Sequence, residues 1–87
     1  MKNICYIVRN NNESKKVQEK YLKEGFKWWD IGKGIKSLPI GKYGTLIDIN
    51  KLDNTIGNFM LNTFQDLKYA KTKFLIVNLN NKNKLEI

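Results

Sequence analysis

The chain has 87 residues, of which 41% are hydrophobic, and 16 basic residues against 8 acidic ones give it a formal net charge of +8. This length provides one modest core and excludes a second core or a lid over an enclosed active site. No apolar run approaches the ~20 residues that span a bilayer, so we expect no membrane-embedded segment. We expect one domain over residues 1–80 and a frayed tail over residues 81–87.

The residues that usually carry catalysis are scarce. Cys5 is the only cysteine, which excludes an internal disulfide and fits a reducing cytoplasm, and the chain has no histidine. One cysteine cannot build a zinc site. Asp30 and Asp48 could face one another across adjacent strands, although ion pairing and solubility are the ordinary roles of such acids. We therefore predict a protein that is not an enzyme and has no cofactor, metal or catalytic residue.

The N-terminal third predicts a strand followed by a helix. β-branched and aromatic residues favour a strand over residues 3–9. Asn10 and Glu13 then have the spacing of a capping box, in which each side chain accepts a hydrogen bond from the other's backbone N–H. A helix with a narrow apolar stripe is predicted over about residues 13–24, and Gly25 predicts a left-handed residue at its end.

The rest of the chain predicts a small sheet. Alternation over residues 26–31 predicts a strand with Phe26, Trp28 and Asp30 on one face. A glycine-rich loop over 32–44, strands over 45–49 and 55–61, a short helical turn over about 64–69 and a strand over 74–79 follow. A helix with so narrow an apolar stripe needs a sheet on which to pack this stripe. The fold class is therefore α+β, in the order β-α-β-β-β-short α-β, with one helix on one face of a mainly antiparallel sheet.

The loop over residues 32–44 is the segment best suited to anion binding. Glycines let backbone N–H groups approach phosphate oxygens, and lysines beside them add positive charge. The candidate ligand-binding residues are Lys33, Lys36, Lys42 and Arg9 for phosphates, and Trp29 and Tyr43 for stacking on a base. The spacing matches no Walker A or Gly-x-Gly-x-x-Gly motif. The alternative is a structural loop whose Ile35, Leu38 and Ile40 pack onto the core.

The paired tryptophans divide between the two faces of the sheet. Neighbouring side chains of a strand point in opposite directions, so Trp28 and Trp29 cannot enter the same core. We expect Trp28 and Phe26 beneath the helix, and Trp29 on the face that the helix leaves uncovered. There Trp29 is either covered by the long loop or available, with Tyr43 as a companion, to stack on a base or anchor a protein interface.

The positive charge favours an anionic partner, such as a nucleotide, a nucleic acid or an acidic protein surface. Fifteen of the 16 basic residues are lysine, and asparagine occurs 12 times. Both amino acids have AT-rich codons, so a genome of low GC content would raise their number without selection for a ligand. The sequence leaves both explanations of the charge open.

The run from Val17 to Trp28 resembles a family of small accessory proteins of phages and mobile elements. In that family a helix of the type KVQ…L leads into a G-(Y/F)-x-W strand, and Gly25, Phe26 and Trp28 match this pattern. The longer loop over 32–44 and the extra Trp29 depart from it. The resemblance implies a protein in the cytoplasm of an infected bacterium. Many such proteins sequester nucleotide second messengers or bind immune effectors such as CRISPR complexes.

Three functional hypotheses follow. The leading one is a non-enzymatic counter-defence protein that sequesters an anionic nucleotide signal, in which a homo-oligomer would help to enclose the ligand. The first alternative is an inhibitor that binds an immune effector protein directly through its aromatic residues. The second alternative is a sequence-tolerant nucleic-acid-binding protein.

Overall fold

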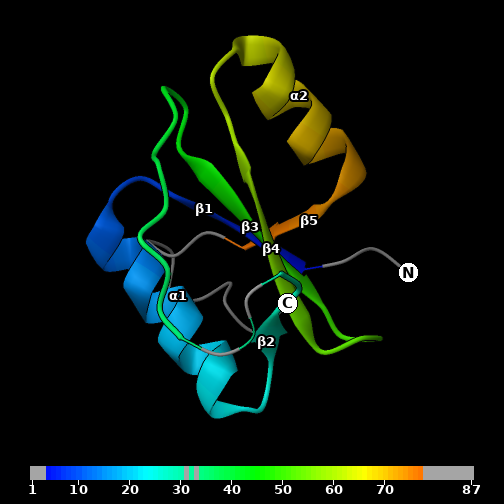
Figure 1. The fold of residues 1–87 in the computed structure, drawn as a ribbon. Coiled ribbons are helices and arrows are strands. Elements are labelled where there is room, and N and C mark those ends of the chain that lie inside the picture. The colour runs from blue at the N-terminus through cyan, green and yellow to red at the C-terminus, as the bar shows by residue number, and fades with distance from the viewer. Residues whose placement is uncertain (1–3, 31, 33, 78–87) are drawn as a thin grey trace.

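The computed structural model describes residues 4–30, 32 and 34–77. The elements follow in the order β1 (Ile4–Val8), α1 (Asn11–Lys23), β2 (Lys27–Trp28), β3 (Thr45–Asn50), β4 (Thr55–Met60), α2 (Phe64–Lys73) and β5 (Leu75–Val77). The strands form one sheet in the order β2-β4-β3-β1-β5 (Figure 1). The longer pairs, β1–β3 and β3–β4, are antiparallel, whereas β1–β5 and β2–β4 are short and parallel. The α+β class with a mainly antiparallel sheet is confirmed.

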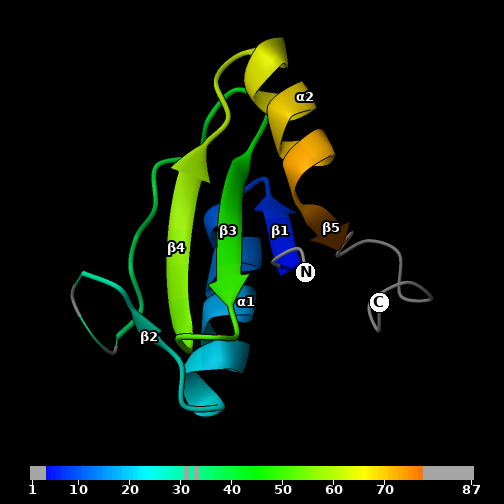
Figure 2. The same ribbon diagram turned by 90° about the vertical axis from the view of Figure 1, so that its right-hand side faces the viewer.

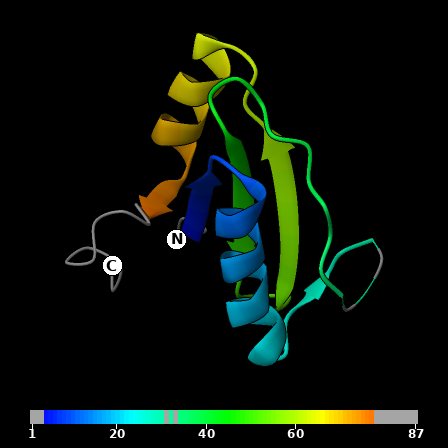
Figure 3. The ribbon, with the colours of Figure 1, turned by 90° about the vertical axis from the view of Figure 1, so that its left-hand side faces the viewer.

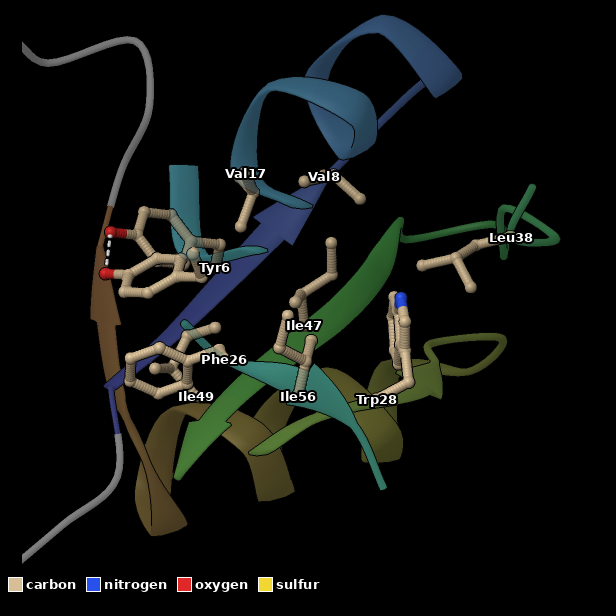
Figure 4. Packing of buried hydrophobic residues seen from close by; sticks show 10 residues of the cluster. Tyr6, Val8, Val17, Phe26, Trp28, Leu38, Ile47, Ile49 and Ile56 are labelled. Atoms are coloured by element: carbon tan, nitrogen blue, oxygen red, sulfur yellow. Dashed lines mark hydrogen bonds between the residues drawn. The ribbon is translucent and has the colours of Figure 1, made fainter. Parts of the chain in front are cut away.

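The helix α1 covers one face of the sheet, and Figure 3 shows it in front of the strands. Alternate residues of β1 and β3 point toward it, because successive side chains of a strand face opposite sides. The core beneath α1 consists of Tyr6, Val8, Val17, Tyr21, Phe26, Trp28, Leu38, Ile47, Ile49 and Ile56 (Figure 4). On the opposite face Cys5 and Leu46 pack with Leu61 and with Ala70 of α2. Within the described residues, neither helix is long and apolar enough to cross a membrane.

The N-terminal cap of α1 differs in one bond from the predicted capping box. The backbone N–H of Glu13 donates to Asn10 Oδ1 at 2.9 Å, as predicted. The Glu13 carboxylate, however, accepts from the backbone N–H of Arg9 at 2.8 Å and not from that of Asn10. Glu13 therefore binds the residue before the N-cap and not the N-cap itself, and this hydrogen bond joins Arg9 to the first turn of the helix.

The C-terminal end of α1 is a Schellman motif. Gly25 has φ +100°, a left-handed conformation that favours glycine, so its predicted role is confirmed. Its N–H donates to Leu22 O at 3.1 Å, and the N–H of Phe26 donates to Tyr21 O at 3.0 Å. The Phe26 ring meets the Tyr21 ring edge-on, with 5.2 Å between centroids. This turn directs the chain back under the helix, where Trp28 enters the core.

The second strand is shorter than predicted. Only Lys27 and Trp28 pair with β4, because the chain turns back at once: the N–H of Trp28 donates to Gly32 O at 2.7 Å, and the N–H of Gly32 donates to Trp28 O at 3.2 Å. Phe26 and Trp28 are buried as predicted, but Asp30 is exposed and lies in the turn. The prediction that Asp30 shares a strand face with them is therefore wrong.

The C-terminal elements are shifted relative to their predicted bounds. The capping box of Thr63 and Asp66 is complete, but the helix that it opens continues to Lys73 instead of ending near Tyr69. The last strand consequently begins at Leu75. The rest of the predicted strand and the predicted tail over 81–87 lie outside the described residues.

The loop after β2 runs along the outer side of β4 and is held by side chains of the core (Figures 2 and 3). The buried amide of Gln18 accepts from the backbone N–H of Lys36 at 2.7 Å and donates to its carbonyl at 2.9 Å. The Trp28 indole N–H donates to Gly34 O at 3.0 Å. Leu38 is buried and Ile40 half-buried against the core, as the structural-loop alternative predicts, whereas Ile35 is exposed.

Replacing Gln18 with alanine should destabilise the fold by at least about 2 kcal/mol, because the backbone N–H and C=O of Lys36 lose their partner in a buried place. Urea or thermal unfolding measures the change. Gln65→Ala is the matched control, since Gln65 is exposed on α2 and its loss should alter stability by less than about 0.5 kcal/mol. Equal stability of the two variants would contradict the role assigned to Gln18.

Two buried groups, the Cys5 thiol and the Tyr6 hydroxyl, favour their protonated forms in the folded chain. Burial, reinforced by the nearby Asp48 carboxylate, raises the pKa of the Cys5 thiol above its ordinary range. Burial and the 2.7 Å hydrogen bond to the Tyr21 hydroxyl likewise raise the pKa of Tyr6. The unfolded chain loses both protons at their ordinary values, near pH 8.5 for a thiol and near pH 10 for a phenol.

Stability should therefore be fully present below about pH 8 and fall as the pH rises through 8.5 and then 10, because above those values the unfolded state binds fewer protons than the folded state. Urea unfolding at a series of pH values measures this dependence. In Cys5→Ala the part of the fall that begins near pH 8.5 should disappear. A wild-type stability that is the same at pH 7 and pH 10.5 would contradict the assignment.

Candidate functional site

The sheet face opposite α1 is only partly covered. Within the described residues, the helix α2 packs on it through Ala70 and Leu67 next to Cys5 and Leu46, and does not cover the part of β3 and β4 around Asp48 and Gly57. Figure 2 looks onto this face and shows β3 and β4 in front of α1, with α2 to one side. A groove with a volume of about 430 Å³ lies here, between the C-terminal half of α2 and the turn after β2. We call it the aromatic groove.

Four aromatic side chains line the aromatic groove: Trp29, Phe59, Tyr69 and Phe74. Trp29 is 72% exposed, Tyr69 is 54% exposed and Phe59 is 44% exposed. The rings of Tyr69 and Phe74 meet edge-on, with their centroids 6.4 Å apart. Exposed aromatic side chains around a hollow combine a large apolar surface with a polar edge, a combination typical of binding sites.

Gly57 opens the floor of the groove. It lies in β4 opposite Asp48 of β3, and it carries no side chain on the face where Trp29 and Phe59 stand. A Cβ atom at this position would meet only the Cδ1 atom of Trp29, at 3.8 Å, which is an ordinary van der Waals distance. The floor of the hollow is therefore open at this position because the residue is glycine, and a larger side chain here would occupy part of the hollow.

Asp48 places a carboxylate in the floor of the groove. Its Oδ1 atom accepts a hydrogen bond of 3.5 Å from the thiol of Cys5, its partner across β1 and β3. Asp30 is elsewhere, in an ion pair of 3.1 Å with Lys36. The two acids do not face one another, because β2 pairs with β4 and not with β3. Within residues 4–30, 32 and 34–77, no group of three or more His, Cys, Asp or Glu residues lies close enough to hold a metal ion.

Lys36 and Lys42, two of the residues predicted to bind phosphate, have different surroundings in the structure. The ammonium of Lys36 is held by Asp30 and lies 4.7 Å from the centroid of the Trp28 ring. The ammonium of Lys42 lies 5.8 Å from the centroid of the Tyr43 ring, at the other end of the loop. Arg9 is exposed after β1. Lys33 lies outside the described residues.

The two residues predicted to stack on a base are also separated. Trp29 lies beside Gly57, whereas the backbone N–H of Tyr43 donates to Leu61 O at 2.8 Å. Gly57 and Leu61 are four residues apart in extended chain, which corresponds to about 13 Å along the sheet. Tyr43 is therefore not a companion of Trp29. Tyr43 is half-buried and meets Phe64 edge-on, with 6.4 Å between centroids.

Trp29 instead has companions that the sequence analysis did not single out. Phe59 and Gly57 alternate along β4 and share one face, a pattern visible in the sequence. Tyr69 and Phe74 come from the end of α2, more than thirty residues away, and no local pattern relates them to Trp29. The expectation that Trp29 lies on the face without α1 is confirmed, and the loop does not cover it.

Comparison of the chain with protein-family models, with curated proteins and with solved structures finds no significant match. The resemblance of the run from Val17 to Trp28 to phage accessory proteins stays a prediction. Function is therefore inferred from the groove and from the charges around it.

Trp29→Phe should remove most of the accessible tryptophan fluorescence. Trp28 is 1% exposed, so the remaining emission should shift to shorter wavelength and resist quenching by iodide. Unfolding free energy should change by less than about 0.5 kcal/mol, because the replaced side chain is at the surface. Iodide quenching that is the same in the variant and the wild type would show that Trp29 is not the exposed tryptophan.

Proposed function

We propose that this protein is a non-catalytic inhibitor that binds another protein through the aromatic groove. The observation that carries this proposal is the gathering of Trp29, Phe59 and Tyr69, all exposed, around one hollow in an otherwise uncovered part of the sheet. Tryptophan and tyrosine are the residues that most often dominate the binding energy of protein interfaces, and they do so in pockets from which the partner excludes water.

The distribution of charge supports a protein partner over a nucleotide. No lysine or arginine is among the described residues that line the groove, and Asp48 lies in its floor. A phosphate placed there would meet the carboxylate of Asp48 and, among the described lining residues, no basic side chain. Of the lysines predicted to neutralise phosphates, Lys36 is already paired with Asp30 and Lys42 lies at the opposite end of the loop. Sequestration of a nucleotide has no comparable observation in its favour.

Inhibition through such a surface needs affinity but no turnover. The partner implied by the resemblance to phage accessory proteins is an immune effector of the bacterial host, such as a CRISPR complex. An aromatic anchor buried in the contact would dominate its energy, and removal of one such side chain typically weakens binding by 2 kcal/mol or more, about thirtyfold.

The test compares three variants for binding to purified CRISPR and other immune effector complexes by biolayer interferometry. Gly57→Val places a side chain in the floor of the groove, where a Cβ atom meets no backbone, and valine is favoured in strands, so the variant should fold and bind at least about thirtyfold more weakly. Trp29→Ala should have a similar effect. Phe64→Ala is the matched control, because Phe64 is 59% exposed but lies outside the groove.

Binding that survives in Gly57→Val, or that is lost equally in Phe64→Ala, would overturn the proposal. A parallel titration of isotope-labelled protein with cyclic and linear nucleotides, followed by NMR, tests the nucleotide hypothesis. Saturable shifts around Lys36 or Lys42, with none around Gly57, would replace protein binding by nucleotide sequestration.

A further inference from the structure

We infer that the aromatic groove receives a proline-rich segment of the partner protein in the extended polyproline II conformation. The inference rests on the proposed function of the groove and names the chemistry of its occupant. It follows from three features of the described residues: aromatic walls that are open to solvent, a carboxylate in the floor that already has partners, and hydrogen-bond donors on the walls that have none.

The aromatic walls lie at the mouth of the groove. Trp29 is 72% exposed and Tyr69 is 54% exposed, so neither ring is enclosed by the rest of the chain. Such rings can pack against flat, rigid groups that lie across them. Grooves lined by aromatic side chains bind proline-rich segments in this way, because a row of proline rings covers several aromatic faces at once.

The floor of the groove favours an uncharged occupant. The carboxylate of Asp48 is the only charged group among the described lining residues, and it already accepts from the Cys5 thiol at 3.5 Å. Asp48 also has a further interaction within the chain, so an occupant that covers it does not leave the carboxylate unpaired. An incoming ion would lose its water here without gaining a counter-charge of its own.

The walls carry polar groups that suit a chain of carbonyl acceptors. The Cδ1 atom of Trp29 lies 3.8 Å from the place of a Cβ atom on Gly57, and this atom is bonded to the indole nitrogen, so the N–H lies close to the floor. The indole N–H can only donate, and no described residue accepts from it. The Tyr69 hydroxyl and the exposed amide of Asn58 likewise have no hydrogen-bond partner among the described residues.

A proline-rich segment matches these donors. The carbonyl groups of a polyproline II helix form no internal hydrogen bonds and can therefore accept from the walls, and proline has no backbone N–H that would need a partner in the groove. The segment is also extended and stiff before it binds, so it loses less conformational entropy than a flexible chain does. A shallow groove with few polar groups benefits most from such an occupant.

The test is an NMR titration of the isotope-labelled full chain with acetyl-hexaproline-amide made of L-proline. One matched peptide is its all-D enantiomer, which has the same composition and the mirror-image helix. The other is acetyl-Ser-Ser-Leu-Ser-Ser-amide, which offers one apolar side chain on a flexible backbone. The L-proline peptide should shift the resonances of Gly57 and of the Trp29 indole N–H and saturate, and the two others should bind at least about tenfold more weakly.

Variants locate the surface that is recognised. Trp29→Ala and Tyr69→Ala should each weaken the L-proline peptide at least about tenfold, because each removes a ring from the walls. Phe64→Ala is the matched control, since Phe64 is 59% exposed but lies outside the groove, and it should change the affinity by less than about twofold. Gly57→Val should weaken the same peptide at least about tenfold.

Equal affinity for the two enantiomers, which needs no variant, would overturn the inference. So would a leucine peptide that binds as tightly as L-proline, the absence of any shift at Gly57, or an equal loss in Phe64→Ala and Trp29→Ala. In each of these cases the proposed function stands or falls separately, on whether Gly57→Val loses binding to an effector protein. Loss of effector binding together with no preference for L-proline would mean that the groove binds a protein segment of another chemistry.

Discussion

Burial of the Trp28 indole beneath α1 is the interaction on which the rest of the structure depends. The ring fills the space between the helix, β3 and β4, and its N–H group donates to Gly34 O at the start of the long loop. The ammonium of Lys36 lies over the ring and is paired with Asp30, so the turn after β2 closes on the same side chain. Because neighbouring side chains of a strand point apart, a buried Trp28 places Trp29 on the other face.

The two faces of the sheet differ in how completely they are covered. On one face α1 and the loop together close the core. Where the loop passes the helix, the side-chain amide of Gln18 forms hydrogen bonds with both the backbone N–H and the carbonyl of Lys36. On the other face α2 covers only the region around Cys5 and Leu46. Gly57 and Asp48, which would be poor core residues, lie where neither of the two described helices covers the sheet, and the exposed aromatic side chains gather around them.

The net charge does not describe how the charges are arranged around the groove. Most lysines of the described residues are exposed on the helices and turns, where an ion pair contributes little to stability. The ammonium of Lys36 is positioned by its neighbours and forms an ion pair with Asp30, so its charge acts within the fold itself. Among the described residues that line the groove, Asp48 is the only charged one, so the lysines that give the chain its net charge are not gathered there.

The sequence by itself determined the features that arise within a few residues of one another: the helix caps at Asn10 and Thr63, the left-handed Gly25, and the division of Trp28 and Trp29 between two faces. Only the tertiary structure decided that β2 is an edge strand beside β4, that Lys36 is paired, and that Tyr69 and Phe74 line the same groove as Trp29. Caps and alternation follow from local hydrogen bonds and the geometry of one strand. The groove depends on strand order and on how α2 packs, and contacts between distant residues set both.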